Sequence, residues 1–348
     1  MIKEAICKLT QRDDLSFKET KVVFEEIFGH KTTPSQIAAF LVALKMKGET
    51  EEEIFAAASV VRQYAKKVKV RQDFMGIEDV GEPIFDTCGT GGSGTNKFNI
   101  STAVAFIVAA AGITMAKHGN RAMSSSCGSA DVLETLGIKI DASPSFMEEA
   151  LKNVGVSFLY APLYHPALGE VAAVRSQIAV RTIFNILGPL CNPASANYQL
   201  LGVYKSELVT VISRVLRKLG VKRAFVVYGK DLKDEVSLTG PTRVAFVNNK
   251  KIVNFTLNPS DFGLKKITLA SIKVKNAKAS AKVIKEVLDG KKGSGRDIVL
   301  ANASCCFYIL GRVNDFKAGV KLAAQLIDTG EAKSKLTEFK KFLRNNLG

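Results

Sequence analysis

The chain has 348 residues, 47% of them hydrophobic, which is enough for one large or two modest cores. No apolar run reaches the roughly 18–20 residues that a membrane span needs, and the first residues lack the apolar stretch of a secretory signal. The six cysteines form no C-x-x-C pair, which argues against a zinc site and favours reduced thiols. We therefore expect a cytoplasmic protein with no membrane partner.

The net charge of +16 is concentrated in the C-terminal part of the chain. Residues 201–348 carry +17, whereas residues 1–70 carry +2 and residues 71–200 carry −3. Such an excess can attract nucleic acid or another polyanion. A lysine-rich, solvated surface is the favoured interpretation, because no aromatic side chains interleave with the lysines as they do in a stacking platform. Nucleic acid is therefore not the expected partner.

The first 70 residues have the pattern of four short helices. Three helix starts are marked by a serine or threonine with a glutamate or glutamine three residues later: Ser16 with Glu19, Thr33 with Gln36, and Thr50 with Glu53. Pro34 suits the first turn of a helix, and Gly48 suits a helix end. Residues 70–82 then look like a linker.

From Pro83 onward, apolar strand-like runs alternate with helical patterns. The runs cover residues 84–87, 113–116, 157–160, 200–204 and 224–228. Such alternation is typical of an α/β layer structure with a mainly parallel sheet. Residues 242–274 look instead like antiparallel strands. Helical patterns cover residues 207–219, 276–288 and 315–327.

Two loops suited to anions lie within residues 86–131. The first, after an apolar strand, is rich in glycines at positions 89, 91, 92 and 94, which permit positive φ and a close approach of backbone to ligand. Its N–H groups and the start of the following helix can point at one anion. The second loop runs from Lys117 to Arg121 and on to three serines at 124–126. A ligand with two separated phosphate groups fits this layout.

The long run resembles the signature of the anthranilate phosphoribosyltransferase family of the nucleoside phosphorylase-like superfamily. The family pattern is roughly GTGGD, FNIST, KHGNR, SS and GSAD-L, and this chain has GTGGS, FNIST, KHGNR, SSS and GSADVL. Further matches are His165-Pro166-Ala167, Val174-Arg175, RTIFNILGPL from Arg181 to Leu190, Asn192-Pro193 and Asp234-Glu235-Val236-Ser237. The resemblance therefore covers nearly the whole chain.

The resemblance implies the fold of that superfamily, with a small helical domain and a larger α/β domain around a mainly parallel central sheet. The helical domain would comprise residues 1–70 joined by residues 165–185. Residues 71–348 would form the α/β domain that binds phosphoribosyl pyrophosphate. The active site would lie in the cleft between them, and the protein would be a homodimer.

The resemblance also implies the reaction, a step of tryptophan biosynthesis. The anthranilate amine would attack the ribose C1 of phosphoribosyl pyrophosphate as pyrophosphate leaves, and no covalent nucleophile is needed. Catalysis would then depend on positioning and on stabilising the departing charge. Mg²⁺ suits this work, since it prefers oxygen ligands and phosphates.

Site residues follow from positions that match the family motifs. Those for phosphoribosyl pyrophosphate are Gly89, Gly92, Ser93, Lys97, Asn99, Ser101, Thr102, Lys117, His118, Gly119, Asn120, Arg121, Ser124, Ser125 and Cys127. Those for anthranilate are Gly89, His118, Asn120 and Arg175, and those for the metal are Ser101, Asp234 and Glu235.

Several of these residues also have an ordinary structural interpretation. Without the motif, Asp234 and Glu235 would be taken as solvated acids, Ser101 as a helix cap and Arg175 as a surface arginine. His118 could be a core histidine. We expect His165 to be structural.

The chain departs from the family pattern close to the loops. Ser93 stands where the family usually has aspartate, Lys97 where it has threonine, and Cys127 where it has serine. The segment Gln177 to Val180 replaces the usual leucine-glycine ending. Ser93 removes an acid near the diphosphate and weakens one metal position, while Lys97 adds a positive charge or points to solvent. We expect activity to survive.

Two other functions compete with the transferase. A pyrimidine nucleoside phosphorylase would use phosphate and a nucleoside, but the KHGN and RTIFNILGPL motifs speak against it. A nucleic-acid-binding paralogue without transferase activity would explain the +17 of residues 201–348, but the metal and substrate motifs oppose it.

Overall fold

The computed structural model describes residues 1–70, 83–122 and 127–346. Four helices open the chain: α1 (Ile2–Thr10), α2 (Phe17–Phe28), α3 (Pro34–Lys47) and α4 (Glu51–Tyr64). All three predicted capping boxes are present, with reciprocal hydrogen bonds at the starts of α2, α3 and α4. Pro34 is in the first turn of α3, and Gly48 ends α3 with a φ of 96°. The predicted linker lies mostly outside the described residues.

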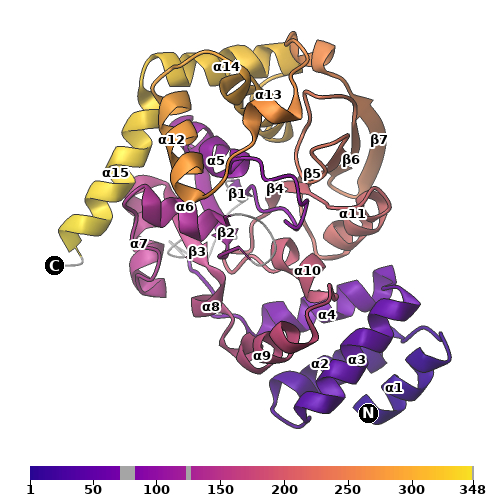
Figure 1. Cartoon of the computed structure of the whole chain (residues 1–348). Helices are drawn as coiled ribbons and strands as arrows, with labels where there is room; N and C mark the ends of the chain where they lie inside the picture. The colour runs from indigo at the N-terminus through magenta and orange to yellow at the C-terminus, as the bar shows by residue number, and fades with distance from the viewer. Residues whose placement is uncertain (71–82, 123–126, 347–348) are drawn as a thin grey trace.

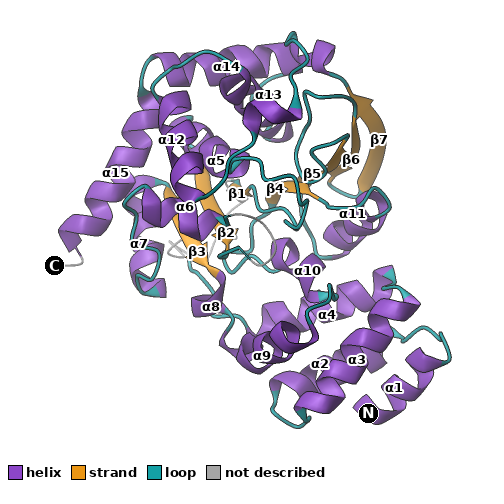
Figure 2. Ribbon diagram, in the orientation of Figure 1, coloured by secondary structure: helices purple, strands orange, loops and turns teal. Residues whose placement is uncertain are grey.

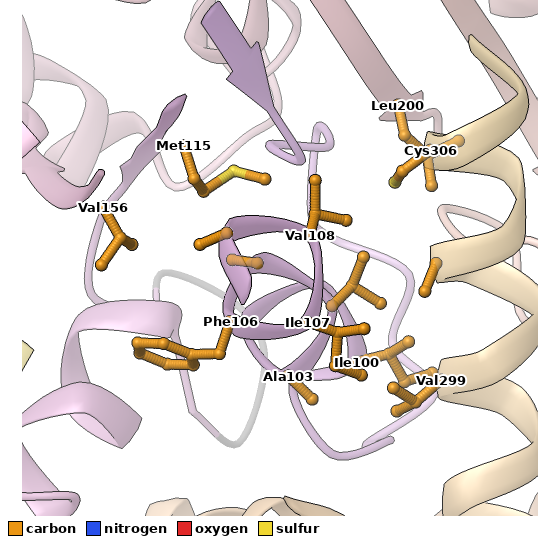
Figure 3. Close-up of a cluster of buried hydrophobic side chains, with 14 of the residues drawn as sticks. Ile100, Ala103, Phe106, Ile107, Val108, Met115, Val156, Leu200, Val299 and Cys306 are labelled. Atoms are coloured by element: carbon orange, nitrogen blue, oxygen red, sulfur yellow. The ribbon is translucent and has the colours of Figure 1, made fainter. Parts of the chain in front are cut away.

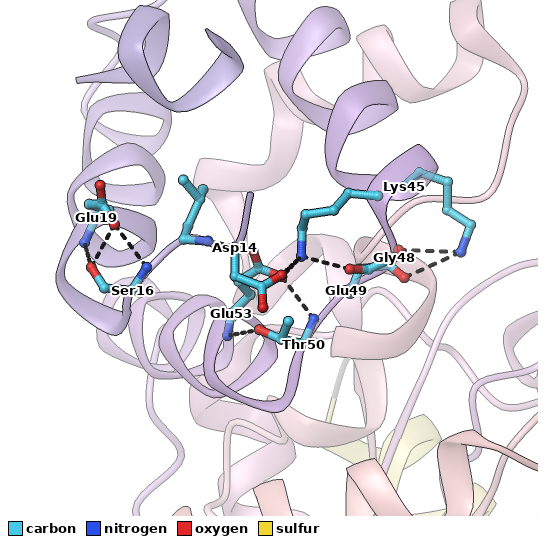
Figure 4. A network of polar contacts seen from close by, with 10 residues as sticks. Asp14, Ser16, Glu19, Lys45, Gly48, Glu49, Thr50 and Glu53 are labelled. Atoms are coloured by element: carbon cyan, nitrogen blue, oxygen red, sulfur yellow. Dashed lines mark hydrogen bonds and ion pairs between the residues drawn. The ribbon is translucent and has the colours of Figure 1, made fainter. Parts of the chain in front are cut away.

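The buried side chain of Glu53 connects several segments of the N-terminal helices (Figure 4). Its carboxylate is fully buried and accepts hydrogen bonds from the backbone N–H groups of Leu15 and Thr50. It also pairs with Lys47 at 2.9 Å. A buried carboxylate is tolerated only when its oxygens have such partners, so this contact fixes how α3, α4 and the loop before α2 meet.

The larger part of the chain is built on a seven-stranded sheet with the order β3-β2-β1-β4-β5-β6-β7 (Figure 2). The strands are β1 (Ile84–Asp86), β2 (Thr114–Gly119), β3 (Val156–Tyr160), β4 (Tyr198–Gly202), β5 (Arg223–Gly229), β6 (Thr242–Asn248) and β7 (Lys251–Leu257). Strands β1 to β5 pair with one another in parallel, and β6 is antiparallel to both β5 and β7. The predicted mainly parallel sheet is therefore confirmed.

Two cores lie on opposite faces of this sheet. Successive side chains of a strand point to opposite faces. Leu200 and Phe225 accordingly join the core that contains α5 (Ile100–Ala110), whereas Leu201 and Ala224 join the core that contains α1–α4. The helices α9 (Gly169–Ile178) and α10 (Phe184–Leu187) pack on α3 and α4, respectively (Figure 1). The exact domain boundaries stay a prediction.

Helix α5 is buried on nearly every side and starts at the site described below. Its side chains point outward in all directions into the core (Figure 3). The side chains around it come from the sheet and from α13 (Ser294–Ile309): Met115, Val156, Leu200, Val299 and Cys306. Close packing of this kind holds the N-terminus of α5 in a fixed position relative to the sheet.

The remaining helices cover the sheet and its ends. They are α6 (Ser129–Thr135), α7 (Pro144–Val154), α8 (Ala161–Tyr164), α11 (Leu208–Lys218), α12 (Ala277–Leu288), α13 (Ser294–Ile309), α14 (Phe316–Asp328) and α15 (Glu331–Asn346). The strand prediction for residues 242–274 is wrong after Leu257. Asn258 caps a short 3₁₀ turn, Pro259–Phe262, which Gly263 ends with a φ of 67°, and a second 3₁₀ turn covers Leu269–Ile272. Among the described residues, no helix is long and apolar enough to cross a membrane.

Candidate active site

The site lies where the strand order of the sheet reverses. The chain proceeds outward from β1 through β2 to β3, and then returns to the other side of β1 with β4 and β5. In open α/β sheets, ligands bind outside the carboxyl ends of the strands at such a switch point. The glycine loop follows β1, the second anion loop follows β2, and the acidic pair follows β5.

The glycine loop packs closely against the end of β4. Gly91, Gly92 and Gly94 have φ between 63° and 71°, a region that other residues avoid. Gly89 is needed for a different reason, since a Cβ there would lie 2.9 Å from the carbonyl oxygen of Gly202. The N–H of Thr90 donates to that carbonyl at 2.8 Å. The loop therefore has a fixed shape before any ligand arrives.

A buried polar cluster connects the glycine loop to the second loop. Lys117 is 4% exposed, and its Nζ donates to the Oγ1 of Thr87 and the Oγ of Ser101 at 3.2 and 3.3 Å. Asp86, at the end of β1, accepts from the N–H groups of Cys88 and His118 and from the Nδ2 of Asn192. Burial raises the pKa of Asp86 to about 6. The cluster holds β1, β2 and the segment after α10 in register.

The acidic pair Asp234 and Glu235 lies between two ammonium groups. Lys97 donates to the Oδ1 of Asp234 at 2.5 Å. Burial raises the pKa of the Glu235 carboxyl to about 7, while Lys97, Lys117 and the backbone of Ser101 lower it. A buried carboxyl with a raised pKa is stabilised by a neighbouring cation, so Glu235, with Ser101 close by, fits Mg²⁺. Asp234, the third predicted metal residue, already pairs with Lys97.

The protein alone does not enclose a metal ion here. Within the described residues, no group of three or more His, Cys, Asp or Glu side chains could hold one. Mg²⁺ is often bound by one or two carboxylates together with substrate phosphates and water. The arrangement therefore suits a metal that arrives with a diphosphate.

Two neutral histidines form part of the wall. The rings of His118 and His165 are 5.2 Å apart, and the Nδ1 of His118 lies 3.0 Å from the carbonyl oxygen of Gly188. Burial lowers the pKa of His118 to about 3 and that of His165 to about 4. Both imidazoles are therefore uncharged at neutral pH and can offer hydrogen bonds but not positive charge.

Arg175 projects from α9 and supplies the positive charge on the opposite wall. Its guanidinium lies 5.5 Å from the ring centre of Phe184, and burial lowers its pKa from the ordinary value. An arginine remains charged after such a shift. A planar guanidinium beside an aromatic ring is suited to bind a carboxylate that is attached to another ring.

One cavity of about 310 Å³ brings most of the predicted residues together. Those in its wall are Gly89, Gly92, Ser93, Lys97, Asn99, Ser101, Lys117, His118, Gly119, Asn120, Arg121, Cys127, Arg175, Asp234 and Glu235. Thr102 is fully buried in α5, away from this wall. Ser124 and Ser125 lie outside the described residues. Arg121 is half exposed and pairs with Asp131 and Glu134.

Three residues of the site region had no role assigned from the sequence. Asp86 and Asn192 belong to the buried cluster described above. The only sequence signals for a role are that Asp86 is a polar residue at a strand end and that Asn192 lies in a family motif. Arg181 donates to the carbonyl oxygen of Gly92 and stacks on Tyr204 at 4.7 Å. It connects the segment after α9 to the glycine loop. His165, expected to be structural, also lines the cavity.

The fold and the site together define a glycosyltransferase with a helical bundle and an α/β domain. Residues 3–65 match the helical bundle domain of the glycosyl transferase family, and residues 81–333 match its a/b domain. The chain belongs to the anthranilate phosphoribosyltransferase family, since curated members of that family are 46% identical to it over 97% of its length.

Relatives of known name are similar to this chain over almost its full length. The anthranilate phosphoribosyltransferases of Citrifermentans bemidjiense and Geobacter sulfurreducens are each 46% identical, over 97% of this chain and 97% and 98% of theirs. The crystal structure of the Thermus thermophilus enzyme has a TM-score of 0.88 and 37% identity, and covers 98% of this chain and 99% of that one. The Saccharomyces cerevisiae enzyme in complex with PRPP and Mg has a TM-score of 0.88 at 28% identity, covering 99% and 98%.

Proposed function

We propose that the chain transfers the phosphoribosyl group of phosphoribosyl pyrophosphate to anthranilate, as a step of tryptophan biosynthesis. The amine nitrogen forms a bond to the ribose C1, the bond from C1 to the diphosphate oxygen breaks with its electrons leaving on pyrophosphate, and the amine loses a proton. The observation that carries this proposal is a cavity lined by both anion loops, the acidic pair and Arg175.

The phosphoribosyl pyrophosphate would occupy the side of the cavity at the ends of β1 and β2. The glycine loop offers backbone N–H groups, and the N-terminus of α5 points its positive end at the same place. Lys117 adds a full charge from a buried position. Ser101 and Asn99 lie at the start of α5, where the Ser101 hydroxyl and the Asn99 Nδ2 can donate to phosphate oxygens.

Anthranilate would occupy the side nearer α9. Arg175 would bind its carboxylate, while His118, Asn120 and Gly89 would contact its ring and amine. Because burial lowers the pKa of His118 to about 3, its neutral ring can form a hydrogen bond with the amine without placing a positive charge beside it. His118 Nε2 is buried without a hydrogen-bond partner among the described residues, which leaves it available to a ligand.

Of the residues expected to hold Mg²⁺, Glu235 and Ser101 would hold it, while Asp234 beside them pairs with Lys97; the ion would neutralise charge on the leaving pyrophosphate. The protein's own contribution is to align C1 with the amine and to exclude water, which is worth several kcal/mol when two reactants are held in a reactive geometry. No side chain of the cavity has to act as a covalent nucleophile.

We also propose that two copies assemble through the helical bundle and work in the cytoplasm. Light scattering on the purified protein measures the mass of the assembly directly, and a mass of one chain would contradict the dimer.

Arg175 provides the sharpest test of the substrate position. We expect Arg175→Ala to raise the KM for anthranilate about ten- to a hundredfold, because hydrogen bonds to charged groups contribute about 1.5–3 kcal/mol. The KM for phosphoribosyl pyrophosphate should change little. Loss of anthranilate fluorescence measures both constants.

Arg217→Ala is the matched control, since it removes an exposed arginine from another helix, α11. It should leave both constants unchanged. Equal effects of Arg175→Ala on the two KM values would contradict the assignment of anthranilate to α9.

A further inference from the structure

Lys97 has an unusually complete set of partners for a lysine beside a ligand cavity. Its ammonium donates to the Oδ1 of Asp234 at 2.5 Å, to the Oγ of Ser93 at 3.0 Å and to the carbonyl oxygen of Leu232 at 3.5 Å. An ammonium has three hydrogens, so all three are used. The side chains of Lys97 and Asp234 are only 9% and 11% exposed.

The backbone on both sides of Lys97 keeps the ammonium in place. Lys97 forms an isolated antiparallel bridge with Lys273, and the N–H of Phe98 donates to the carbonyl oxygen of Ile272. Asn96, just before it, has a φ of 51°. Ser93 is itself buried and contacts the Oγ1 of Thr95 at 3.0 Å. The Lys97 ammonium is therefore held in the wall of the cavity and does not point to solvent.

The two departures from the family pattern at positions 93 and 97 both change the net charge of the site. Serine in place of aspartate at position 93 removes one negative charge, and lysine in place of threonine at position 97 adds one positive charge. Together they make the site more positive by two charges, which is the charge of one divalent cation. The structure places the new positive charge directly on a predicted metal ligand.

We propose that the Lys97 ammonium replaces a divalent cation on the glycine-loop side of the acidic pair, so that Asp234 pairs with lysine and metal binding is left to Glu235 and Ser101. This inference rests on the proposed function, since it concerns the cations that accompany the diphosphate. A metal could reach Asp234 only by displacing an ammonium from three acceptors in a poorly solvated place, where the freed charge would lack partners.

Binding of Mn²⁺ to the substrate-free protein tests this competition, with unbound Mn²⁺ measured by electron paramagnetic resonance. We expect Lys97→Thr to bind Mn²⁺ at least about tenfold more tightly than the unchanged protein, because removing a cation in contact with a carboxylate favours another cation there. Lys273→Thr removes an exposed lysine from the bridge partner and should bind Mn²⁺ as the unchanged protein does. Equal affinity in all three proteins would overturn the inference.

The double variant Ser93→Asp with Lys97→Thr restores both family residues and serves if the single variant does not fold. In the presence of pyrophosphate it should bind one more equivalent of Mn²⁺ than the unchanged protein. An unchanged number of bound ions would overturn the inference.

Thermal unfolding tests the same inference by measuring Tm, without any catalytic assay. Mn²⁺, compared with a chelator, should raise the Tm of Lys97→Thr more than that of the unchanged protein, because the variant binds the ion more tightly. No difference between the two proteins would count against the inference. Turnover of anthranilate without these metal effects would overturn the role of Lys97 and leave the proposed function standing.

Discussion

At the scale of single residues, the cavity is defined by side chains whose charge has been set by burial. Burial lowers the pKa values of His118 and His165, so both are neutral, and it raises the pKa of Glu235, while the Lys117 ammonium is held by hydroxyl partners. The positive charge of the cavity therefore comes from lysine and arginine and not from histidine. This division suits a reaction in which an anion leaves and an amine must stay unprotonated.

The lowered pKa of His165 predicts a pH-dependent stability. The unfolded chain binds a proton at a pKa of about 6.5, whereas the folded chain resists it until about pH 4. The contribution of this residue is therefore present above pH 6.5 and is lost as the pH falls toward 4. Because His165 is 5% exposed, the loss can reach about 3 kcal/mol.

Urea unfolding of the protein and of His165→Gln at pH 7 and pH 4.5 measures this effect. The unfolding free energy of the unchanged protein should fall more between the two pH values than that of the variant, in which this titration is absent. Equal decreases would contradict a buried, neutral His165.

Some residues of the site could be predicted from the sequence and some could not. Lys117, His118 and Asp234 stand in motifs that the resemblance picks out, and the structure gathers them at one cavity. Asp86 carries no comparable signal, because an aspartate at a strand end is common and its partner Asn192 is 106 residues away. The partnership of Lys97 with Asp234 was equally hidden, because it depends on a contact across 137 residues.

At the scale of elements, local signals predicted the starts of α2, α3 and α4, whereas the buried helix α13 was not predicted. The three capping boxes are contacts within four residues, so the sequence contains all of their information. Helix α13, by contrast, is buried on nearly all sides. Such a helix lacks the one-sided pattern that marks a surface helix. Residues 258–274 were misjudged because proline and glycine turn the chain after β7.

Glu53 allows a direct test of how the helical bundle is held. We expect Glu53→Ala to lower the free energy of unfolding by about 3 kcal/mol, because it leaves buried donors on Leu15, Thr50 and Lys47 without their acceptor. Glu52→Ala, one residue earlier and exposed, should cost less than about 0.5 kcal/mol. Chemical denaturation compares the two variants, and similar losses would argue against Glu53 as an anchor.

Gly202 connects the glycine loop to the acidic pair. A Cβ at this position would overlap the carbonyl group of Asp234. We expect Gly202→Ala to displace the loop of Asp234 and Glu235, costing about 1–3 kcal/mol of stability, and to lower kcat more than it raises the KM for anthranilate. Steady-state kinetics with a melting curve check both parts, and full activity would show that the acidic loop tolerates displacement.

At the scale of the whole molecule, the sheet topology places the chemistry. Because β1 lies at the switch point of the strand order, the loops after β1, β2 and β5 converge on one place. The packing of α9 on α3 brings Arg175 to the same cavity from the helical side. The cleft between two parts was predicted only through the resemblance, since no local pattern reveals which distant helices pack together.

The most direct test of the transferase measures substrates and products together. Purified protein, anthranilate, phosphoribosyl pyrophosphate and Mg²⁺ should give a loss of anthranilate fluorescence equal to the pyrophosphate released, and omission of phosphoribosyl pyrophosphate should stop both. Absence of turnover by the folded protein, or phosphorolysis of a pyrimidine nucleoside in its place, would contradict the proposed reaction.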